Sequence, residues 1–336
     1  MSTPSKPHAP TLAVLLSFGA IYFLWGSTYI FIKWGIATIP PMILAGSRHF
    51  LAGLAMYAWI RLRGGEKPTR AQWWSATVLG ALMLFGGNGG VTWAQQTVPS
   101  GVAALIIAAV PMWMTLLDWL RPRGHRPYGR VIAGLVMGFG GIALLIGPGK
   151  FGGDRVDLTG AAILLFASLS WATGSLLSRH MKLPATLVLS IAMQSIAGGV
   201  LLLLAAGPAG NWARFSFDAI SLRSAISLLY LVIFGSIIGF TCYIWLLKVT
   251  TPARVSTYAY VNPLVALFLG WSLGGEAISQ RSLLAAVVII SAVVMIVTHK
   301  DRVAHVPAEE ESPLLKTETA DLGCAPASPP EPAPEA

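Results

Sequence analysis

Residues 93–111 read W-A-Q-Q-T-V-P-S-G-V-A-A-L-I-I-A-A-V-P, and residues 245–263 read W-L-L-K-V-T-T-P-A-R-V-S-T-Y-A-Y-V-N-P. Both stretches open with Trp, pass through a short polar break that contains Thr and Pro, and place a Pro 18 positions after the Trp. The pairing extends upstream, because W-G-S at 25–27 has a counterpart in W-A-T at 171–173. Matched segments of this kind indicate an internal repeat. We therefore expect two units of roughly 145 residues each.

The composition is that of a membrane protein. Hydrophobic residues make up 55% of the 336 residues and charged residues only 11%, whereas soluble domains carry about 25% charged residues. A helix needs about 20 mostly apolar residues to span a bilayer. Ten runs of this kind lie near 12–33, 41–61, 72–93, 101–120, 128–147, 158–179, 185–206, 223–247, 253–273 and 281–299.

The Lys and Arg residues predict the orientation of these runs. If the N-terminus lies inside, sixteen of the 23 basic residues fall in inner segments, six in outer segments, and Arg48 within a run. Because cytoplasmic loops carry the excess of Lys and Arg, and because an even number of spans returns the chain to the same side, we expect both termini in the cytoplasm.

The runs divide the chain into a cytoplasmic N-terminus (1–11), a first repeat (12–147), a second repeat (158–299) and a tail (300–336). Each repeat holds five runs, an odd number, so the two repeats are expected to have opposite orientations in the membrane. This arrangement is typical of secondary transporters. The tail is rich in Pro, Glu and Ala and poor in large apolar residues, which predicts disorder.

Several classes of function are not expected. Residues 1–300 carry 21 basic and 6 acidic residues, but the basic ones lie in short loops, so no nucleic-acid partner is predicted. The chain has no H-E-x-x-H motif and no pair of acidic residues within a run, and we find no convincing Ser–His pair. An intramembrane enzyme would need one of these, so we expect no catalysis, no metal and no cofactor.

Arg48 is the clearest polar residue inside a predicted span. It follows Pro41 by seven residues, which is about 10 Å along a helix. Ionisable residues at this depth are costly and face a cavity or a partner. Arg48 could bind a carboxylate or another anion or repel cations, or it could be a packed side chain that bonds to free carbonyls of a neighbouring helix. The sequence leaves both alternatives open.

Aromatic, amide and hydroxyl side chains in the predicted spans form a second candidate set. Such side chains can line a cavity for amphipathic solutes, with ring faces for apolar parts and amides for orientation. The alternative for the aromatic members is a belt at the membrane interface. The set consists of Trp25, Ser27, Thr28, Asn88, Trp93, Trp113, Trp171, Thr173, Trp245, Tyr258 and Asn262, with Tyr29, Thr92, Gln95, Gln96, Ser175, Tyr243 and Tyr260 near them.

Pro111 and Pro263 are expected to break helices at matching positions of the two repeats. A proline inside a helix removes a backbone hydrogen bond and kinks the helix. Matched breaks in the two halves of a transporter point to a central binding site. The alternative is curvature without a functional role.

Charged groups near the span ends suggest how transport is driven. Asp118 lies beside Arg121 near the end of its run, so a local ion pair is expected there. Lys33 is expected to extend to the membrane surface. Proton- and sodium-coupled pumps place Asp or Glu at mid-membrane, and we find no such residue in the sequence, which favours facilitated export or exchange.

Several of these residues together resemble a known family. The motifs are W-G-S-T at 25–28, P-P at 40–41 followed by Arg48, T-V-P-S-G-V-A-A-L-I at 97–106, and G-E at 275–276. Residues 10–300 resemble the EamA-type drug/metabolite transporters, and within them the YedA-like exporter branch. The resemblance implies ten helices in two inverted repeats and export of small metabolites from the cytoplasm. It also implies a central cavity lined by the first, third, fourth, sixth, eighth and ninth helices.

The chain departs from this family at one place. Many relatives carry Gly-Glu after the fourth helix as well as after the ninth, whereas this chain reads R-G-H-R at 123–126. A mechanism that needs a Glu in both repeats is therefore in doubt.

We expect an inner-membrane exporter of amino acids or related amphipathic solutes that works by alternating access. The expected partners are a small-molecule substrate and the lipid bilayer, with the protein as a monomer or a dimer. The alternatives are efflux of drugs and toxic compounds by the same fold, or a structural membrane subunit or scramblase that transports no solute.

Overall fold

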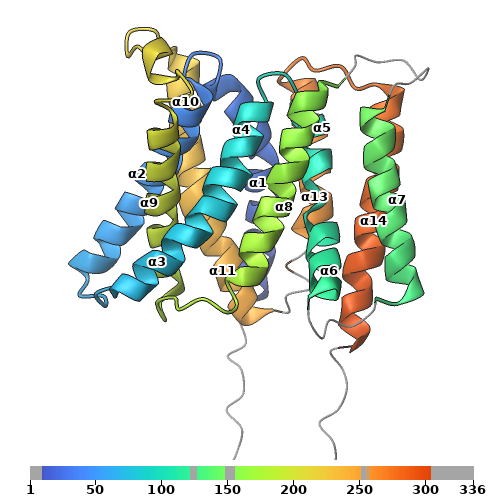
Figure 1. Cartoon of the computed structure of the whole chain (residues 1–336), viewed down its shortest axis with the longest axis horizontal. Coiled ribbons are helices and arrows are strands. Elements are labelled where there is room, and N and C mark those ends of the chain that lie inside the picture. Colours follow the sequence, from blue (N-terminus) through green and yellow to red (C-terminus); the bar gives the residue numbers. More distant parts are fainter. Residues whose placement is uncertain (1–9, 122–126, 148–155, 251–254, 256, 304–336) are drawn as a thin grey trace, which may run out of the picture.

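The computed structural model describes residues 10–121, 127–147, 156–250, 255 and 257–303, and these residues form helices and no strand (Figure 1). The first repeat contains three long helices and two rods made of shorter pieces. Its elements are α1 (Thr11–Gly35), α2 (Pro41–Leu62), α3 (Arg70–Leu79), the π-helix η1 (Gly80–Gly89), α4 (Gly90–Ala94), α5 (Ser100–Ile107), α6 (Val110–Leu120) and α7 (Gly129–Ile146).

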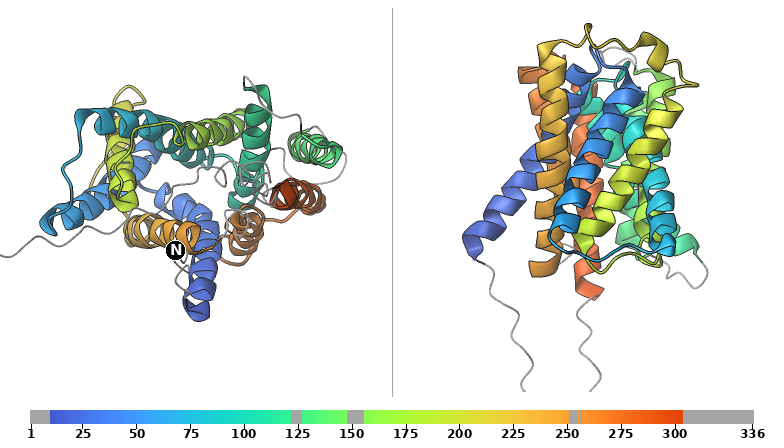
Figure 2. Two further views of the ribbon diagram at one scale, coloured as in Figure 1. Left: turned by 90° about the horizontal axis from the view of Figure 1, so that it is seen from below. Right: turned by 90° about the vertical axis from the view of Figure 1, so that its left-hand side faces the viewer.

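The second repeat likewise begins with two long helices and a composite rod that contains a π-helix, but its fourth rod is a single helix among the described residues. Its elements are α8 (Leu158–Leu177), α9 (Leu187–Ala205), the short 3-10 helix η2 (Trp212–Arg214), α10 (Leu222–Tyr230), the π-helix η3 (Leu231–Ile238), α11 (Gly239–Val249), α13 (Tyr258–Ser272) and α14 (Gln280–Val303). The start of α1 and the end of α14 lie at the same end of the bundle (Figure 2).

Seven helical segments among the described residues are long and apolar enough to cross a membrane. They correspond to seven of the ten expected runs. The runs expected at 41–61, 72–93 and 253–273 do not meet this standard, because α2 carries Arg48 and His49 and α13 has only 15 residues. The expected tail and the R-G-H-R segment at 123–126 lie outside the described residues.

Local side chains account for where several helices begin. Thr69 accepts a hydrogen bond from the Gln72 backbone N–H, and the Gln72 side chain accepts one from Thr69, so a capping box begins α3. Asp157 accepts hydrogen bonds from the first backbone N–H groups of α8. These caps satisfy donors that a helix cannot satisfy internally.

Glycines allow the two repeats to pack closely. A Cβ atom added at Gly53 of α2 would lie 2.7 Å from the Ile196 backbone nitrogen, and one at Gly199 of α9 would lie 2.6 Å from the Phe50 nitrogen. The backbones of α2 and α9 therefore touch. The pairs α2–α9, α7–α14 and α1–α13 each join one repeat to the other, so the repeats interlock.

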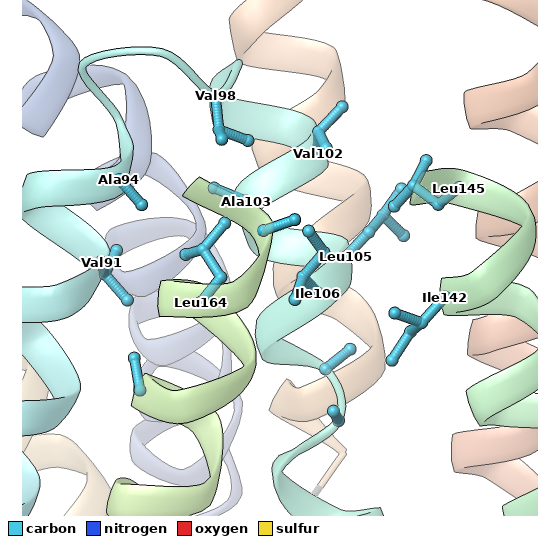
Figure 3. Close-up of a cluster of buried hydrophobic side chains, with 14 of the residues drawn as sticks. Val91, Ala94, Val98, Val102, Ala103, Leu105, Ile106, Ile142, Leu145 and Leu164 are labelled. Carbon is cyan, nitrogen blue, oxygen red and sulfur yellow. The ribbon is translucent and has the colours of Figure 1, made fainter. Parts of the chain in front are cut away.

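The largest buried apolar cluster surrounds α5 and holds it in place. Leu105 and Ile106 of α5 contact this cluster together with Leu145 of α7 and Leu164 of α8 (Figure 3). Apolar side chains elsewhere point outward, including Leu15 and Phe23 on α1. Outward apolar faces fit a lipid environment, where helix packing rests on van der Waals contact.

The π-helical segments η1 and η3 occupy the third rod of each repeat. The wider backbone turns of π-helices often occur at functional sites. Both segments contribute to the site described below: η1 through Gly87 and Asn88, and η3 through Ser236.

Candidate functional site

A cavity lies between the helices of the two repeats. It encloses about 950 Å³ of space free of protein atoms, its open side included. The lining includes nine residues of the predicted site: Trp25, Thr28, Arg48, Asn88, Pro111, Trp171, Tyr258, Asn262 and Pro263.

Arg48 contributes the cavity's charge. Its side chain is 5% exposed, and its Nε donates a hydrogen bond of 3.0 Å to Ser236 Oγ of η3. Its two terminal nitrogens make no hydrogen bond or ion pair with any residue that the structure describes. A partner for the guanidinium among neighbouring backbone carbonyls, the structural alternative, is therefore not found among the described residues.

Aromatic rings form one wall of the cavity. The Trp25 ring meets the Tyr258 ring edge to face at 5.0 Å between centroids and lies 5.4 Å from the Phe240 ring. Trp25 Nε1 also donates to the Gly235 carbonyl at 3.2 Å. The ring is therefore fixed by contacts with the second repeat and can present a rigid apolar surface.

An unsatisfied acceptor also belongs to the lining. The Asn262 amide oxygen is buried and accepts no hydrogen bond from any residue within the described part of the chain. Most buried polar atoms have a partner, so an acceptor of this kind suits a donor that the protein itself does not supply.

Five predicted site residues do not line the cavity. Ser27 exchanges a hydrogen bond with the Tyr230 hydroxyl, and Thr173 donates to the Leu169 carbonyl of its own helix. Trp245 packs against a separate apolar cluster around Ile21. Trp93 is half-buried outside the lining.

Trp113 is the fifth of these residues and acts indirectly. Its Nε1 donates to Ser168 Oγ at 3.0 Å, and Ser168 itself lines the cavity. Trp113 therefore positions a lining residue and does not face the cavity space.

The predictions missed Ile32, Ser168 and Phe240, which also line the cavity. In α1, the spacing of the residues in the sequence could have identified Ile32 as a lining residue. Trp25, Thr28, Tyr29 and Ile32 all line the cavity, and they follow the i, i+3, i+4, i+7 spacing of one helix face.

The two prolines line the cavity but differ in their backbone setting. Helix α5 ends at Ile107 and α6 begins at Val110, so the break precedes Pro111, which lies in the first turn of α6. Pro263 lies inside the continuous helix α13. The helical rod is thus interrupted just before Pro111, whereas α13 continues through Pro263, and a kink at both prolines stays a prediction.

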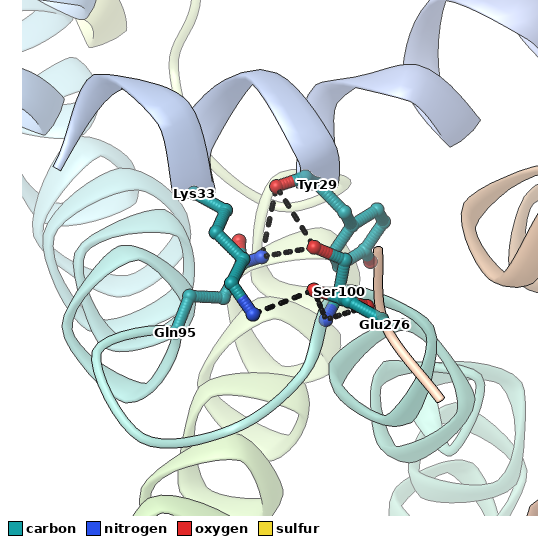
Figure 4. A network of polar contacts seen from close by, with 5 residues as sticks. All are labelled: Tyr29, Lys33, Gln95, Ser100 and Glu276. Carbon is teal, nitrogen blue, oxygen red and sulfur yellow. Dashed lines mark hydrogen bonds and ion pairs between the residues drawn. The ribbon is translucent and has the colours of Figure 1, made fainter. Parts of the chain in front are cut away.

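A polar network lies beyond the cavity, at the end of the bundle where α1 ends and α5 begins (Figure 4). Lys33 Nζ lies 2.7 Å from Glu276 Oε1, and both Glu276 oxygens accept from the Ser100 backbone N–H at 3.0 and 2.9 Å. Gln95 Nε2 donates to the Tyr29 carbonyl at 2.8 Å. This network, which we call the Glu276 latch, ties α1 and α5 to the second repeat.

The latch corrects one expectation. Lys33 does not simply extend to the membrane surface, because it pairs with a carboxylate that lies 243 residues away in the sequence. The expected pair of Asp118 with Arg121 is present at 3.1 Å. Within the described residues, no three His, Cys, Asp or Glu side chains gather as metal ligands would.

Comparison with known proteins identifies relatives over most of the chain. Residues 11–147 and 158–298 each match the EamA-like transporter family. The chain is 38% identical over 283 residues to the "Uncharacterized inner membrane transporter YedA" of Escherichia coli strain K12, covering 84% of this chain and 89% of YedA. It is 25% identical over 287 residues to a "Probable amino-acid metabolite efflux pump" of the same strain, covering 81% of this chain and 90% of the pump.

A solved crystal structure shares the fold. It superposes with a TM-score of 0.59 at 21% identity and covers 88% of this chain and 99% of its own. The two family matches agree with the repeat in the sequence and with the interlocked halves of the structure. The chain therefore belongs to the EamA-like transporter family.

Proposed function

We propose that this protein is a secondary transporter of the inner membrane that exports small organic metabolites by alternating access. The observation that carries the proposal is the central cavity, because both repeats line it. Trp25 and Arg48 come from the first repeat and Trp171 and Tyr258 from the second. If the repeats move relative to one another, a solute in this cavity can be exposed first to one side and then to the other.

Two features support ten spans in two inverted repeats. The three rods that are less apolar, α2, α3–η1–α4 and α13, lie beside the other spans and contribute lining residues to the cavity. Helix α1 starts at the lower end of the bundle in Figure 1 and α8 starts at the upper end. We infer that polar lining residues reduce the apolarity of α2, where Arg48 faces the cavity and not lipid.

The orientation follows from charge. The bundle end at which α1 starts also holds the ends of α2 and α6, with Arg61 and Arg121. By the positive-inside rule this end faces the cytoplasm, and export then runs toward the end that holds the Glu276 latch. The name of YedA supports the inner membrane.

Amino acids or related amphipathic solutes are the proposed cargo. The cavity combines aromatic walls with a few polar groups, and one relative is named for amino-acid metabolite efflux. The second candidate is efflux of drugs, which the Trp25–Tyr258–Phe240 wall would also accommodate. Neither candidate requires catalysis by the protein.

The test is efflux from proteoliposomes loaded with a mixed panel of amino acids, purines and cationic drugs, with and without a pH gradient. Selective release that needs no gradient would support facilitated export. Release that needs the gradient would mean that transport is coupled to protons. If no solute leaves faster than from protein-free liposomes, the structural-subunit and scramblase alternatives replace the proposal.

A blocking variant ties the activity to the cavity. Ala259 is a lining residue of α13, so Ala259→Trp should fill part of the space and slow release of the transported solute. Ala58 lies on an exposed part of α2, so Ala58→Trp is the matched control and should transport like the wild type. Equal activity of the two variants would argue against transport through this cavity.

A further inference from the structure

The cavity holds a positive charge that the protein does not neutralise. Arg48 is the charged side chain among the lining residues that the structure describes. The ion pairs found among the described residues, Lys33–Glu276 and Asp118–Arg121, do not include it. A guanidinium stays protonated under all ordinary conditions. A buried cation without a partner is costly, so this lining suits a ligand that brings one negative charge.

The geometry around Arg48 favours a planar anion. Ser236 Oγ engages only Nε, and the two terminal nitrogens remain for a ligand. A guanidinium binds a carboxylate through two parallel hydrogen bonds, and such charge-assisted bonds are roughly twice as strong as neutral ones. One Arg matches one carboxylate, whereas a doubly charged phosphate would leave a second charge uncompensated.

The rest of the lining specifies the remainder of the ligand. Trp25, Tyr258 and Phe240 offer ring faces and edges, and the Asn262 amide oxygen offers a free acceptor. Among the lining residues that the structure describes there is no carboxylate, so an ammonium group on the ligand would find no charged partner there.

We propose that the cavity selects small aromatic monocarboxylates: Arg48 binds the carboxylate, and Asn262 accepts a hydrogen bond from a donor on the ring. This inference rests on the proposed function and narrows it. An ammonium group is not required, so an aromatic acid without one is transported at least as well as the corresponding amino acid, and a cationic amine is rejected.

If the transported solute is an anion, the membrane potential itself drives its export. A monoanion that leaves a cell with a negative interior moves down the membrane potential, which favours the outside by roughly fiftyfold for each 100 mV. Export of such a solute needs no coupled ion, which fits a lining without an acidic residue.

The first test compares three probes that share the indole ring, and one with a naphthalene ring, in wild-type proteoliposomes. Indole-3-acetate, indole-3-acetamide and tryptamine differ in charge, and 1-naphthaleneacetate keeps the charge but lacks the ring N–H. Counterflow, corrected for protein-free liposomes, should prefer indole-3-acetate to the amide and the amine by about ten- to a hundredfold. An imposed potassium diffusion potential should steer flux of the anion and leave flux of the amide unchanged.

The second test uses variants. Arg48→Gln should lower indole-3-acetate transport by about ten- to a hundredfold and bring it to the level of the amide. Asn262→Ala should remove the preference for indole-3-acetate over 1-naphthaleneacetate. Arg63→Gln is the matched control, because Arg63 is an exposed Arg at the end of the same helix, stacked on Trp59.

The results of these tests distinguish a failure of the proposed selectivity for aromatic monocarboxylates from a failure of the proposed export function. Transport of tryptamine or the amide as fast as the acid in wild type would overturn the inference and leave the exporter standing. Release of other panel solutes without any of these probes would do the same. Release of no solute at all would overturn both. The wild-type comparison holds even if Arg48→Gln fails to fold.

Discussion

Arg48 and Lys33 are both cations inside the first repeat, but only one of them has a carboxylate partner. Lys33 pairs with Glu276 in the latch at 2.7 Å, whereas Arg48 bonds only to a neutral hydroxyl and borders the central cavity. The paired charge joins two repeats. The unpaired charge is available to a ligand. We infer a structural role for the paired charge at the latched end of the bundle, and we propose substrate binding at the unpaired charge in its middle.

Reversing the charge at Arg48 should have the largest effect of any change to these two cations. In Arg48→Glu, the cavity would repel indole-3-acetate, because like charges in a desolvated site cost several kcal/mol. We expect its transport to fall by at least about a hundredfold and transport of tryptamine to appear. Counterflow of both probes measures this, with size-exclusion profiles as the folding control. Unchanged selectivity in a folded variant would separate Arg48 from the substrate.

The latch predicts a second, smaller effect that concerns stability and opening. In Glu276→Ala, the Ser100 N–H at the start of α5 and the Lys33 ammonium both lose their partner. We expect the free energy of unfolding to fall by about 1–3 kcal/mol, seen as a lower melting temperature in detergent. Selectivity between indole-3-acetate and tryptamine should not change.

Opening of the latched end can be followed with a thiol. Ile32 is 3% exposed and lines the cavity one helical turn from Tyr29, so Ile32→Cys reports access in a background with Cys242→Ala and Cys324→Ala. A membrane-impermeant thiol reagent should label it faster when Glu276→Ala is added. Equal labelling rates would mean that the latch does not control access.

Lys33 should matter less than its partner. Its side chain is 38% exposed, and exposed ion pairs contribute about 0–1 kcal/mol. Lys33→Met should therefore lower the melting temperature less than Glu276→Ala, since Glu276 still accepts from Ser100. A larger loss for Lys33→Met would show that the ion pair, and not the helix cap, holds this end together.

The smallest predicted effect concerns Asp157, at the start of α8. A hydrogen bond from the Thr97 hydroxyl, and then one from the Gly160 N–H, lower the pKa of this carboxyl from its ordinary value of 3.8. A lowered pKa stabilises the fold above the ordinary value, and this contribution is lost as pH falls through the folded-state pKa. Asp157→Asn should thus melt slightly lower than wild type at neutral pH, and the difference should vanish in strong acid.

The sequence predicted the repeat and the outline of the cavity through local signals. W-G-S-T at 25–28 and the segment that follows Trp171 each lie within a single apolar run. Their position in the run gives their approximate depth in the membrane. Arg48 stood out because charges inside spans are rare. Nine of the fourteen predicted site residues reach the cavity.

The remaining features depend on contacts between distant segments. Glu276 pairs with Lys33 across 243 residues, and no local pattern reports such a contact. Trp113 and Trp245 have the residue type and depth of lining residues, but the rotation of their helices turns them toward other neighbours. The close contact of η1 with α8 at Gly86, where an added Cβ would collide with Ser170 Oγ, likewise joins segments far apart in the sequence.

The most direct test of the central claim is equilibrium binding of indole-3-acetate, measured by titration calorimetry on purified wild type, Arg48→Gln and Lys33→Met. We predict that Lys33→Met binds like the wild type and that Arg48→Gln binds about ten- to a hundredfold more weakly. Equal binding by the wild type and Arg48→Gln would contradict the account, and so would an equal loss in both variants.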